Sequence, residues 1–542
     1  MNMPGRSRVI LFLATVAIAF LSNEPAKAQE PTPTAGRKAT VSKAVKPSIS
    51  LALREVTPLG PRGPVTPHEA HPVRKLPPLP ATRAPLGRDP VLQPAAPVAP
   101  PVSTPVGFDG IGDDFEGAGS SHPRYSVVVA PPDTTGAPGE TQYVQWVNTA
   151  FGIFKKDTGA ILYGPADGQT LWKGYGGKCE TDNDGDPVVL YDRLAKRWVM
   201  TQFAVTGGPP YFQCVAVSRT SDATGAYARY AYEFADFNDY PKFGVWPDGY
   251  YATFNMFGET DFLGSKACAF ERSKMIAGTP ARMVCFDVSA ADGGGGMLPS
   301  DLDGSAKPPA QSPNYFLNFG RDRLNLWKFK VNWTKPSAST FTGPTAIPVA
   351  GFEPACNDGP SCIPQPGAGK LDALGDRLMF RLAYRNFTTH QSLVVNHSVV
   401  ADPGTGAAGI RWYELRNIGS AIPEVHQQGT YAPDAASRWI GSIAMDKSGN
   451  VAMGYSVSGS SVSPSARFTG RGAGDPPNAM GAEIVVQNGS GTQQLNRWGD
   501  YSDISVDPKD DCTFWFTTEY LPASGKFNWK TRIVHFKFTS CH

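Results

Sequence analysis

Residues 497–520, RWGDYSDISVDPKDDCTFWFTTEY, contain two predicted strands joined by an acidic turn, and this plan organises the rest of the chain. Residues 501–506 alternate with the period of two that is typical of a half-buried strand. Residues 507–510 are turn formers, because proline presets φ and aspartate oxygens accept hydrogen bonds from nearby backbone N–H groups. Residues 512–520 are rich in Thr, Phe and Trp, which suit a pleated surface.

The same order of polar start, strand, turn and aromatic strand recurs along the chain and predicts an all-β fold built from repeats. The predicted units are 142–163, 185–233, 242–287, 314–331, 375–415, 439–486 and 497–538. Most of them start roughly 40 to 65 residues apart, as expected for four-stranded β-propeller blades with insertions. We predict seven blades, with six or eight as alternatives because the fourth unit is irregular. The short run 125–129 is predicted to complete the last unit, so that an N-terminal strand closes the ring.

Composition and charge narrow the class of protein. The chain has 542 residues, of which 18% are charged, with 57 Gly and 50 Pro. This mix fits many turns between aromatic strands and does not fit a helical bundle. The formal net charge of +2 gives no strong attraction for polyanions, so we expect no nucleic-acid partner.

The beginning of the chain predicts export. Residues 1–28 have the features of a secretory signal peptide, with Arg6 and Arg8 before an apolar run and a small-x-small cleavage site at residues 26–28. No later run reaches about 18 apolar residues, so we expect no transmembrane segment. The mature protein is predicted to be secreted or periplasmic.

The rest of the chain divides into two predicted parts. Residues 29–107 are crowded with Pro, Ala, Thr and Val and show no sustained period, which predicts a disordered, extended linker. This linker is either a solvated spacer or a docking arm for an anionic polysaccharide. Residues 108–542 are predicted to form the propeller domain.

The cysteines predict disulfide bonds. The chain has eight: Cys179, Cys214, Cys268, Cys285, Cys356, Cys362, Cys512 and Cys541. An even number in an exported protein indicates four disulfides, although eight cysteines allow 105 pairings. We expect sequential pairing, because each neighbouring couple flanks one hairpin or loop. Zinc binding is the alternative, and the absence of any CxxC pair argues against it.

Three runs carry a resemblance to a known type of protein. They are GDPVVLYD at 185–192, YPKFGVWPDGYY at 240–251 and RWGDYS at 497–502. These runs resemble secreted bacterial β-propeller proteins, which often share the shape of the sialidase-like superfamily. The resemblance covers about residues 125–541 and implies the fold more than an activity. Residues 505–515 are also similar to the Asp-box of sialidases, but their turn is longer and lacks the glycine.

The candidate site follows from the predicted fold, because the first strand of each blade lines the central channel. Polar residues at the starts of these strands should converge on one mouth: Asp186, Lys242, Asp376, Arg438 and Asp500, with Arg497 close by. We predict four catalytic residues, Asp376, Asp500, Glu519 and Tyr384. We predict five substrate-binding residues, Lys242, Arg381, Arg438, Arg497 and Tyr501. The alternative is structural, since blades need polar caps and Arg/Tyr contacts between neighbours.

Residues 182–186, DNDGD, predict a calcium loop. Asp182, Asp184 and Asp186 place oxygen ligands at alternating positions beside a turn glycine. The loop lacks the distant glutamate of an EF-hand, and an ordinary acidic turn is the alternative.

These observations together predict a secreted propeller that engages an extracellular polysaccharide or a cell-surface glycan. As an enzyme it would be a glycoside hydrolase that uses paired carboxylates. The alternatives are a non-catalytic extracellular module that binds carbohydrate or protein, and a polysaccharide lyase with a Tyr or His base. No nucleophile elbow, P-loop, dinucleotide loop or zinc-protease motif is present in the sequence. The oligomeric state cannot be read from these patterns.

Overall fold

The computed structural model describes residue 1 and residues 37–60, 66–70, 74–78, 87–95, 98–117, 124–357, 359, 361–367, 369–421 and 423–542. The predicted signal peptide lies outside these residues apart from Met1. Residues Arg37–His542 form one compact unit.

Antiparallel meanders of four strands are the repeated element of this unit. The first sheet has β7 (Thr135–Pro138), β8 (Gln142–Val147), β9 (Ala150–Lys155) and β10 (Ile161–Asp167). The second has β11 (Val188–Asp192), β12 (Arg197–Ala204), β13 (Tyr211–Ser218) and β14 (Tyr227–Phe234). The third has β15 (Phe237–Val245), β16 (Tyr250–Phe257), β17 (Phe262–Phe270) and β18 (Met283–Ser289).

The second half of the chain repeats this plan. The fourth sheet has β19 (Leu298–Asp303), β20 (Asn314–Gly320), β21 (Arg323–Lys330) and β22 (Thr340–Pro348). The fifth has β25 (Met379–Asn386), β26 (Gln391–Asp402), β27 (Ala407–Arg416) and β28 (Glu424–Tyr431). The sixth has β29 (Ser437–Met445), β30 (Val451–Gly459), β31 (Val462–Arg471) and β32 (Ile484–Gln487). The last has β33 (Asp503–Val506), β34 (Thr513–Tyr520), β35 (Lys530–Lys537) and β5 (Val106–Asp109).

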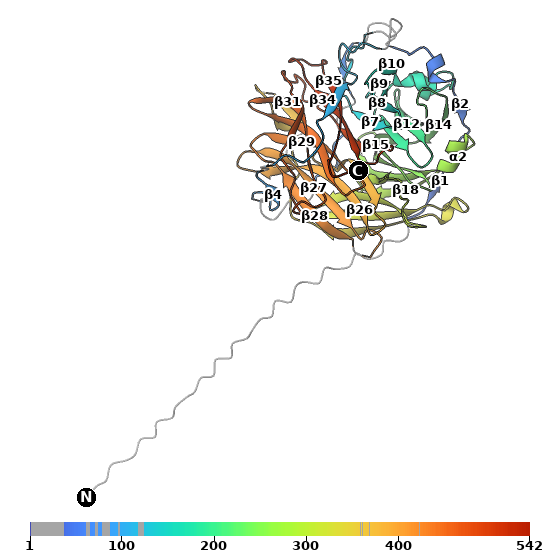
Figure 1. Ribbon diagram of the computed structural model, residues 1–542. Helices are drawn as coiled ribbons and strands as arrows, with labels where there is room; N and C mark the ends of the chain where they lie inside the picture. Colours follow the sequence, from blue (N-terminus) through green and yellow to red (C-terminus); the bar gives the residue numbers. More distant parts are fainter. Residues whose placement is uncertain are drawn as a thin grey trace. The chain divides into compact units, whose positions relative to one another are not determined.

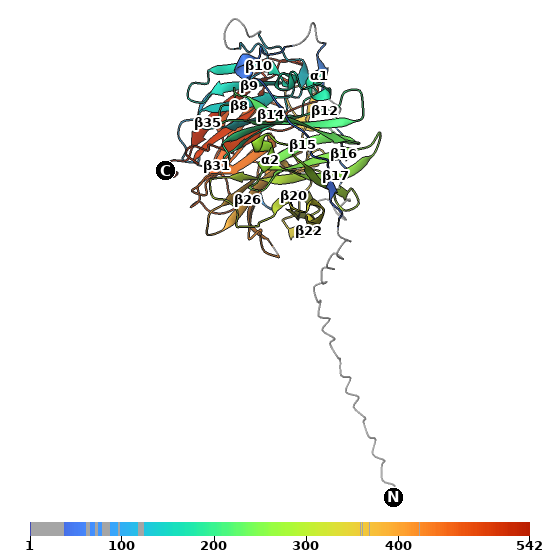
Figure 2. The same cartoon turned by 90° about the vertical axis from the view of Figure 1, so that its right-hand side faces the viewer.

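The first strands of the sheets face one another. Strand β7 contacts β11, and contacts then run in order through β15, β19, β25, β29 and β33, which contacts β7. Strands β19 and β25 also pair in parallel, with Ser300 opposite Leu382. In Figure 1, β7 and β15 lie toward the middle, whereas β2, β28 and β31 lie toward the rim. Figure 1 also places helix α2 (Arg272–Ala277) at the rim, and in Figure 2 this helix faces the viewer. This is the arrangement of a β-propeller.

Aromatic side chains fill the spaces between neighbouring sheets. Between the third and fourth sheets, the Tyr251 and Phe286 rings lie 5.2 and 5.1 Å from the Phe329 ring. Because both faces of most strands are buried, their side chains are buried at successive positions rather than at every second one. A single sheet could not bury both faces, so each sheet depends on its two neighbours.

Short strands from the N-terminal segment lie on the outer edges of several sheets. Strand β1 (Thr40–Val41) pairs with β18, β2 (Ser48–Ile49) with β14, and β4 (Leu92–Gln93) with β28. The predicted disordered linker therefore differs from the structure, in which described parts of residues 37–107 belong to the compact unit. Extended chain without periodicity can still pair, because N–H groups between prolines reach the free edge of a sheet.

The fourth strand of the last sheet is not the predicted run 125–129. Strand β5 takes this place, with Phe108 opposite Ile533. Tyr125 instead forms a bridge with Phe115, and β6 (Val129–Ala130) pairs with β3 (His68–Glu69). The run 125–129 was the stronger sequence candidate because it has three consecutive valines, but four residues suffice for an edge strand.

All eight cysteines lie in described residues and form the predicted sequential pairs. The bonds are Cys179–Cys214, Cys268–Cys285, Cys356–Cys362 and Cys512–Cys541. Four disulfides indicate an oxidising compartment. No helix in the described ranges has both the length and the apolar content of a membrane span.

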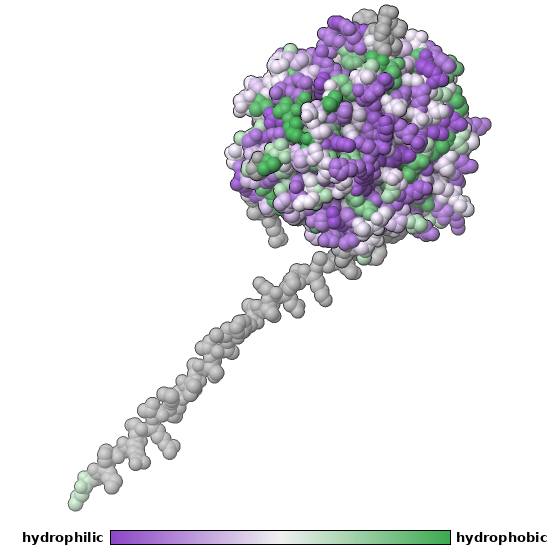
Figure 3. All heavy atoms as spheres, in the orientation of Figure 1, coloured by the Kyte–Doolittle hydropathy of each residue, from purple (hydrophilic) through white to green (hydrophobic). Residues whose placement is uncertain are grey.

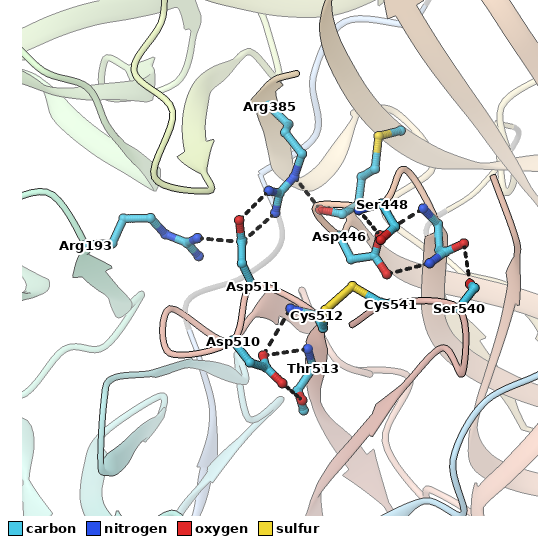
Figure 4. The surroundings of a disulfide bond; sticks show 12 residues. Arg193, Arg385, Asp446, Ser448, Asp510, Asp511, Cys512, Thr513, Ser540 and Cys541 are labelled. Carbon is cyan, nitrogen blue, oxygen red and sulfur yellow. Dashed lines mark hydrogen bonds and ion pairs between the residues drawn. A yellow bond between two sulfur atoms is a disulfide. The ribbon is translucent and has the colours of Figure 1, made fainter. Parts of the chain in front are cut away.

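The disulfide Cys512–Cys541 ties the last turn to the end of the chain (Figure 4). Beside it, the Asp511 carboxylate accepts hydrogen bonds from Arg385 at 2.8 and 2.9 Å. Arg193 of the second sheet donates to the same carboxylate at 3.1 Å. Asp511 therefore links the last sheet to the second and fifth sheets. Figure 3 shows that hydrophilic residues gather near the middle of the face in view.

Candidate functional site

Residues with a left-handed backbone recur where the first strands begin. Asp133, Asp186, Tyr240, Ile440 and Asp500 have φ values of 47°, 47°, 53°, 50° and 56°. Asp133, Asp186 and Asp500 lie two or three positions before β7, β11 and β33, whereas Tyr240 and Ile440 lie inside β15 and β29 at a register shift. This conformation costs roughly 1–3 kcal/mol per residue other than glycine and is concentrated at functional sites. The repetition marks one end of the channel, which we call the mouth.

Four charged residues from different sheets meet at the mouth, and Lys242 is their centre. The Lys242 side chain is fully buried, and its Nζ lies 3.7 Å from the ring centroids of both Tyr240 and Tyr501. Burial lowers the pKa of Lys242 to about 8, although Asp186 and other nearby carboxylates oppose this shift. We call Asp133, Asp186, Lys242 and Asp500, with their immediate neighbours, the mouth cluster.

Asp133 is a buried carboxyl group without a hydrogen-bond partner. Its side chain is 1% exposed, and neither oxygen has a partner among the described residues. Burial raises the pKa of Asp133 well above its ordinary value, and the charges of Asp500 and Asp186 raise it further. An ionised carboxylate would lose its hydration there, so burial favours the protonated form of Asp133, although the charges of Arg497 and Lys242 oppose this shift.

Asp186 and Asp239 lie where solvent can reach the mouth cluster. The Asp186 Oδ2 atom accepts a hydrogen bond from the backbone N–H of Tyr240 at 3.1 Å. Burial raises the pKa of Asp239 to about 7, with a further increase from the charge of Asp186. Both side chains are half-buried, as is Asp500. A molecule at the surface can therefore approach these three carboxyl groups.

Arg497 connects the mouth to the interior. Its guanidinium group donates to Asp500 Oδ1 at 2.8 Å and to Asp372 Oδ2 at 3.1 Å. Burial raises the pKa of Asp372 to about 8. The predicted catalytic residue Glu519 lies behind this pair, is 1% exposed, and has a pKa that burial raises well above its ordinary value. Glu519 accepts a hydrogen bond from the backbone N–H of Gly499 and lies near Asp372, so it belongs to the layer behind the mouth cluster.

Asp376 lies at the edge of the mouth and is bound on two sides. Arg377 pairs with it at 2.7 Å, and the backbone N–H of Leu76 donates to it at 3.1 Å. The Arg377 guanidinium group also lies 4.5 Å from the Tyr240 ring centroid. The predicted residues Asp186, Lys242, Asp376, Arg497, Asp500 and Tyr501 are thus brought to this end of the channel.

Two other predicted site residues, Arg438 and Tyr384, lie away from the mouth cluster. Arg438 is fully buried in ion pairs with Asp434 and with Glu483, the latter at 2.9 Å. The Tyr384 hydroxyl group donates to Gln391 at 2.9 Å, and its ring packs on Trp246 between sheets. These contacts correct the predicted roles of Arg438 and Tyr384, because they hold the fold together.

Arg381 lies deeper in the channel. Its guanidinium group donates to Asp301 and Asp303, each at 2.8 Å. These residues line a cavity of about 20 Å³ together with Asp503, which is space for about one water molecule. Arg381 therefore joins the fourth and fifth sheets and is not part of the mouth cluster, which corrects its predicted role in substrate binding.

The three carboxylates of the predicted calcium loop turn in different directions. Asp184 accepts hydrogen bonds from the N–H groups of Val205 and Thr206 at 2.6 and 2.8 Å. Asp182 accepts one from the Thr181 hydroxyl at 2.7 Å, and Asp186 faces Tyr240. In the described ranges, no group of three or more His, Cys, Asp or Glu side chains has the arrangement of a metal site. The alternation in sequence therefore does not produce converging ligands here.

Asp133 and Asp239 are not among the site residues predicted from the sequence. Asp133 precedes the strand Thr135–Pro138, whose Gly and Pro give no strand signal. Asp239 lies inside β15, directly before the run that carries the resemblance, at a register shift that the sequence does not reveal.

No protein-family model and no curated protein matches this chain. Among solved structures, a neuraminidase-like protein of A/flat-faced bat/Peru/033/2010 is similar at 8% identity and a TM-score of 0.27, covering 72% of this chain and 99% of its own. An exo-β-1,3-galactanase from Phanerochaete chrysosporium is similar at 10% identity and a TM-score of 0.28, covering 79% and 96%. A polysaccharide lyase that acts as an ulvan lyase is similar at 12% identity and a TM-score of 0.27, covering 76% and 81%.

Proposed function

We propose that this protein is a secreted glycoside hydrolase that cleaves an extracellular glycan at the mouth cluster. One observation carries the proposal. The buried carboxyl group of Asp133 has no hydrogen-bond partner among the described residues and interacts with the charge of Asp500, which is paired with Arg497. Glycosidic cleavage by a pair of carboxyl groups needs one that holds a proton and one that is ionised. Acid–base sites typically place two neighbouring acids in different surroundings, so that one keeps its proton and the other is ionised.

The proposed roles follow from these surroundings. Asp133 is the general acid, because it has a proton to donate and no competing partner in the described part of the chain. Asp500 is the base or nucleophile, since Arg497 pairs with it at 2.8 Å. Lys242 is a positioning residue, because its ammonium group lies among the carboxylates and against the rings of Tyr240 and Tyr501.

The proposal includes a ring of seven blades, closed by an N-terminal strand. The succession of contacts from β7 through β33 and back to β7 supports this count. The pairing of β5 with β35 supports closure, because β5 precedes the first sheet in sequence and joins the last sheet. Such a ring would hold residues from the first and last sheets side by side, as Asp133 and Asp500 require.

The test is a screen of purified protein against a panel of extracellular polysaccharides. New reducing ends from the wild type, and none from Asp133→Asn or Asp500→Asn at unchanged Tm, would support hydrolysis. Asp261→Asn, an exposed turn residue between β16 and β17, is the matched control and should keep full activity. Retention of a glycan without product would show a binding module instead. Products with ultraviolet-absorbing unsaturated ends would show a lyase.

A further inference from the structure

A cavity of about 630 Å³ lies beside Asp376, and Tyr240 and Lys242 are not among its described lining residues. Its walls are the loop at residues 290–295, the hairpin between β20 and β21, and residues 76–78 of the N-terminal segment. This volume lies within the range of about 300–1,000 Å³ that is typical of pockets for small ligands. Phe319, Leu76 and several prolines supply apolar surface.

The polar wall of this cavity is held in place by a chain of hydrogen bonds. Asn318 donates to the carbonyl oxygens of Gly293 and Gly295, each at 2.8 Å. Asn325 donates to Asn318 Oδ1 at 3.0 Å and accepts from Arg323 Nε at 3.0 Å. The hairpin and the glycine-rich loop are thus fixed relative to each other before any ligand binds, which reduces the entropy lost on binding.

Arg321 is a cation in this wall whose Nε–H group makes no hydrogen bond to the described residues. It lies in the turn between β20 and β21 and is half-buried, and its buried Nε atom has no hydrogen-bond partner among the described residues. Two carboxylates line the same cavity. Asp376 is already paired with Arg377 at 2.7 Å, and Asp292 is exposed at the rim. A planar guanidinium group with an unused N–H suits a carboxylate or sulfate, which can accept two parallel hydrogen bonds.

We propose that this cavity binds an acidic sugar unit and that Arg321 forms an ion pair with its anionic group. The shared chemistry is a saccharide that bears a carboxylate or a sulfate ester. Asp376 connects the cavity to the mouth, because its partner Arg377 packs on the Tyr240 ring. The idea that the acidic unit belongs to the cleaved polysaccharide rests on the proposed function, whereas binding in the cavity does not.

The test measures binding calorimetrically in the Asp133→Asn background, so that no substrate is consumed. The probes are a galacturonic acid trimer, a sulfated galactose trimer and a neutral galactose trimer. We expect an acidic trimer to bind more tightly than the neutral one. Arg321→Gln should weaken its binding about 10- to 100-fold, the range for a lost hydrogen bond to a charged group, without weakening the neutral trimer as much. The better of the two acidic probes identifies the anionic group.

The control is Arg54→Gln, which removes an exposed arginine that pairs with Asp222 at 3.2 Å. Equal binding of acidic and neutral trimers, or equal affinity of the Arg321→Gln and Arg54→Gln proteins, would overturn the inference. Its failure can be told from failure of the proposed function. If only the inference fails, Asp133→Asn still abolishes cleavage but Arg321→Gln does not weaken binding of the acidic trimer. If only the proposed function fails, Arg321→Gln weakens this binding but no cleavage depends on Asp133.

Discussion

Asp503 forms hydrogen bonds between the last and first sheets, and the titration of Asp503 tests this contact. Asp503 of β33 accepts hydrogen bonds from the Thr135 hydroxyl at 3.1 Å and from the Gly136 N–H at 3.2 Å, both in β7. Its other oxygen has no hydrogen-bond partner in the described ranges. Asp503→Asn can keep the two accepted bonds and removes the charge.

Burial raises the pKa of Asp503 from 3.8 to about 7. The folded protein therefore holds this proton more tightly than the unfolded chain does. The resulting stabilisation is fully present below about pH 4 and is lost as the pH rises through about 7. The difference in pKa corresponds to about 4 kcal/mol of unfolding free energy.

The assay is urea unfolding of both proteins, followed by tryptophan fluorescence between pH 4 and pH 8. Other groups titrate in both proteins, so their effects largely cancel in the difference. Relative to the wild type, the free energy of unfolding of Asp503→Asn should increase with pH by up to about 4 kcal/mol. Asp287→Asn, at an exposed position, should show no such increase. A constant offset across this range would refute the burial of Asp503 between the two sheets.

Three further perturbations test how the chain is fastened together. Replacing both Cys512 and Cys541 by Ser opens a loop with a sequence separation of 29 and should lower the free energy of unfolding by roughly 3 to 4 kcal/mol in urea titrations. Phe108→Ala should cost roughly 1–3 kcal/mol, measured as a lower Tm, because this ring of β5 packs on the first sheet as well as on the last. Asp89→Ala should cost roughly 3–5 kcal/mol and speed proteolysis near residue 89, because it leaves the fully buried Arg411 without its carboxylate partner.

Each of these perturbations has a matched comparison. The pair Cys356–Cys362 has a sequence separation of only 6, so its removal should cost roughly 2 kcal/mol by the same loop-entropy relation. Equal losses for the two disulfides would contradict a role for loop length. Val106→Ala changes an exposed residue of the same strand as Phe108, and an equal effect on Tm would contradict the packing argument. Unchanged proteolysis of Asp89→Ala would show that the N-terminal segment is held by other contacts.

The strands with regular side-chain patterns were predicted from the sequence. The strands that are extended only because they pair with a neighbouring strand were not predicted. The stretch 497–520 became β33, a turn and β34, because turn formers and aromatic strand residues agree there. Strand β7 was missed because Thr-Gly-Ala-Pro has no strand signal, and its neighbours impose its conformation. The edge strands from residues 37–107 were missed for a related reason, since a pair of residues can join a sheet without any period of its own.

The candidate site was predicted where turn chemistry marks the start of a first strand. The Gly-Asp pairs at 185–186 and 499–500 each precede a first strand, and both aspartates lie near enough to Lys242 to raise its pKa. Arg438 was misplaced because sequence does not reveal the register shift between Trp439 and Ser442, which sets where a side chain near it points. The state of Asp133 could not be predicted at all, because it depends on burial and on charges from distant parts of the chain.

The most direct test of the central claim is a comparison of two leaving groups in the Asp133→Asn protein. A general acid matters most when the departing alcohol is a poor leaving group and matters little for an activated aryl glycoside. We therefore predict that Asp133→Asn lowers kcat/KM by about 10²–10⁴-fold on the natural glycan and much less on the aryl glycoside of the same sugar. Equal losses on both substrates, or no loss on either, would contradict the assignment of Asp133 as the proton donor.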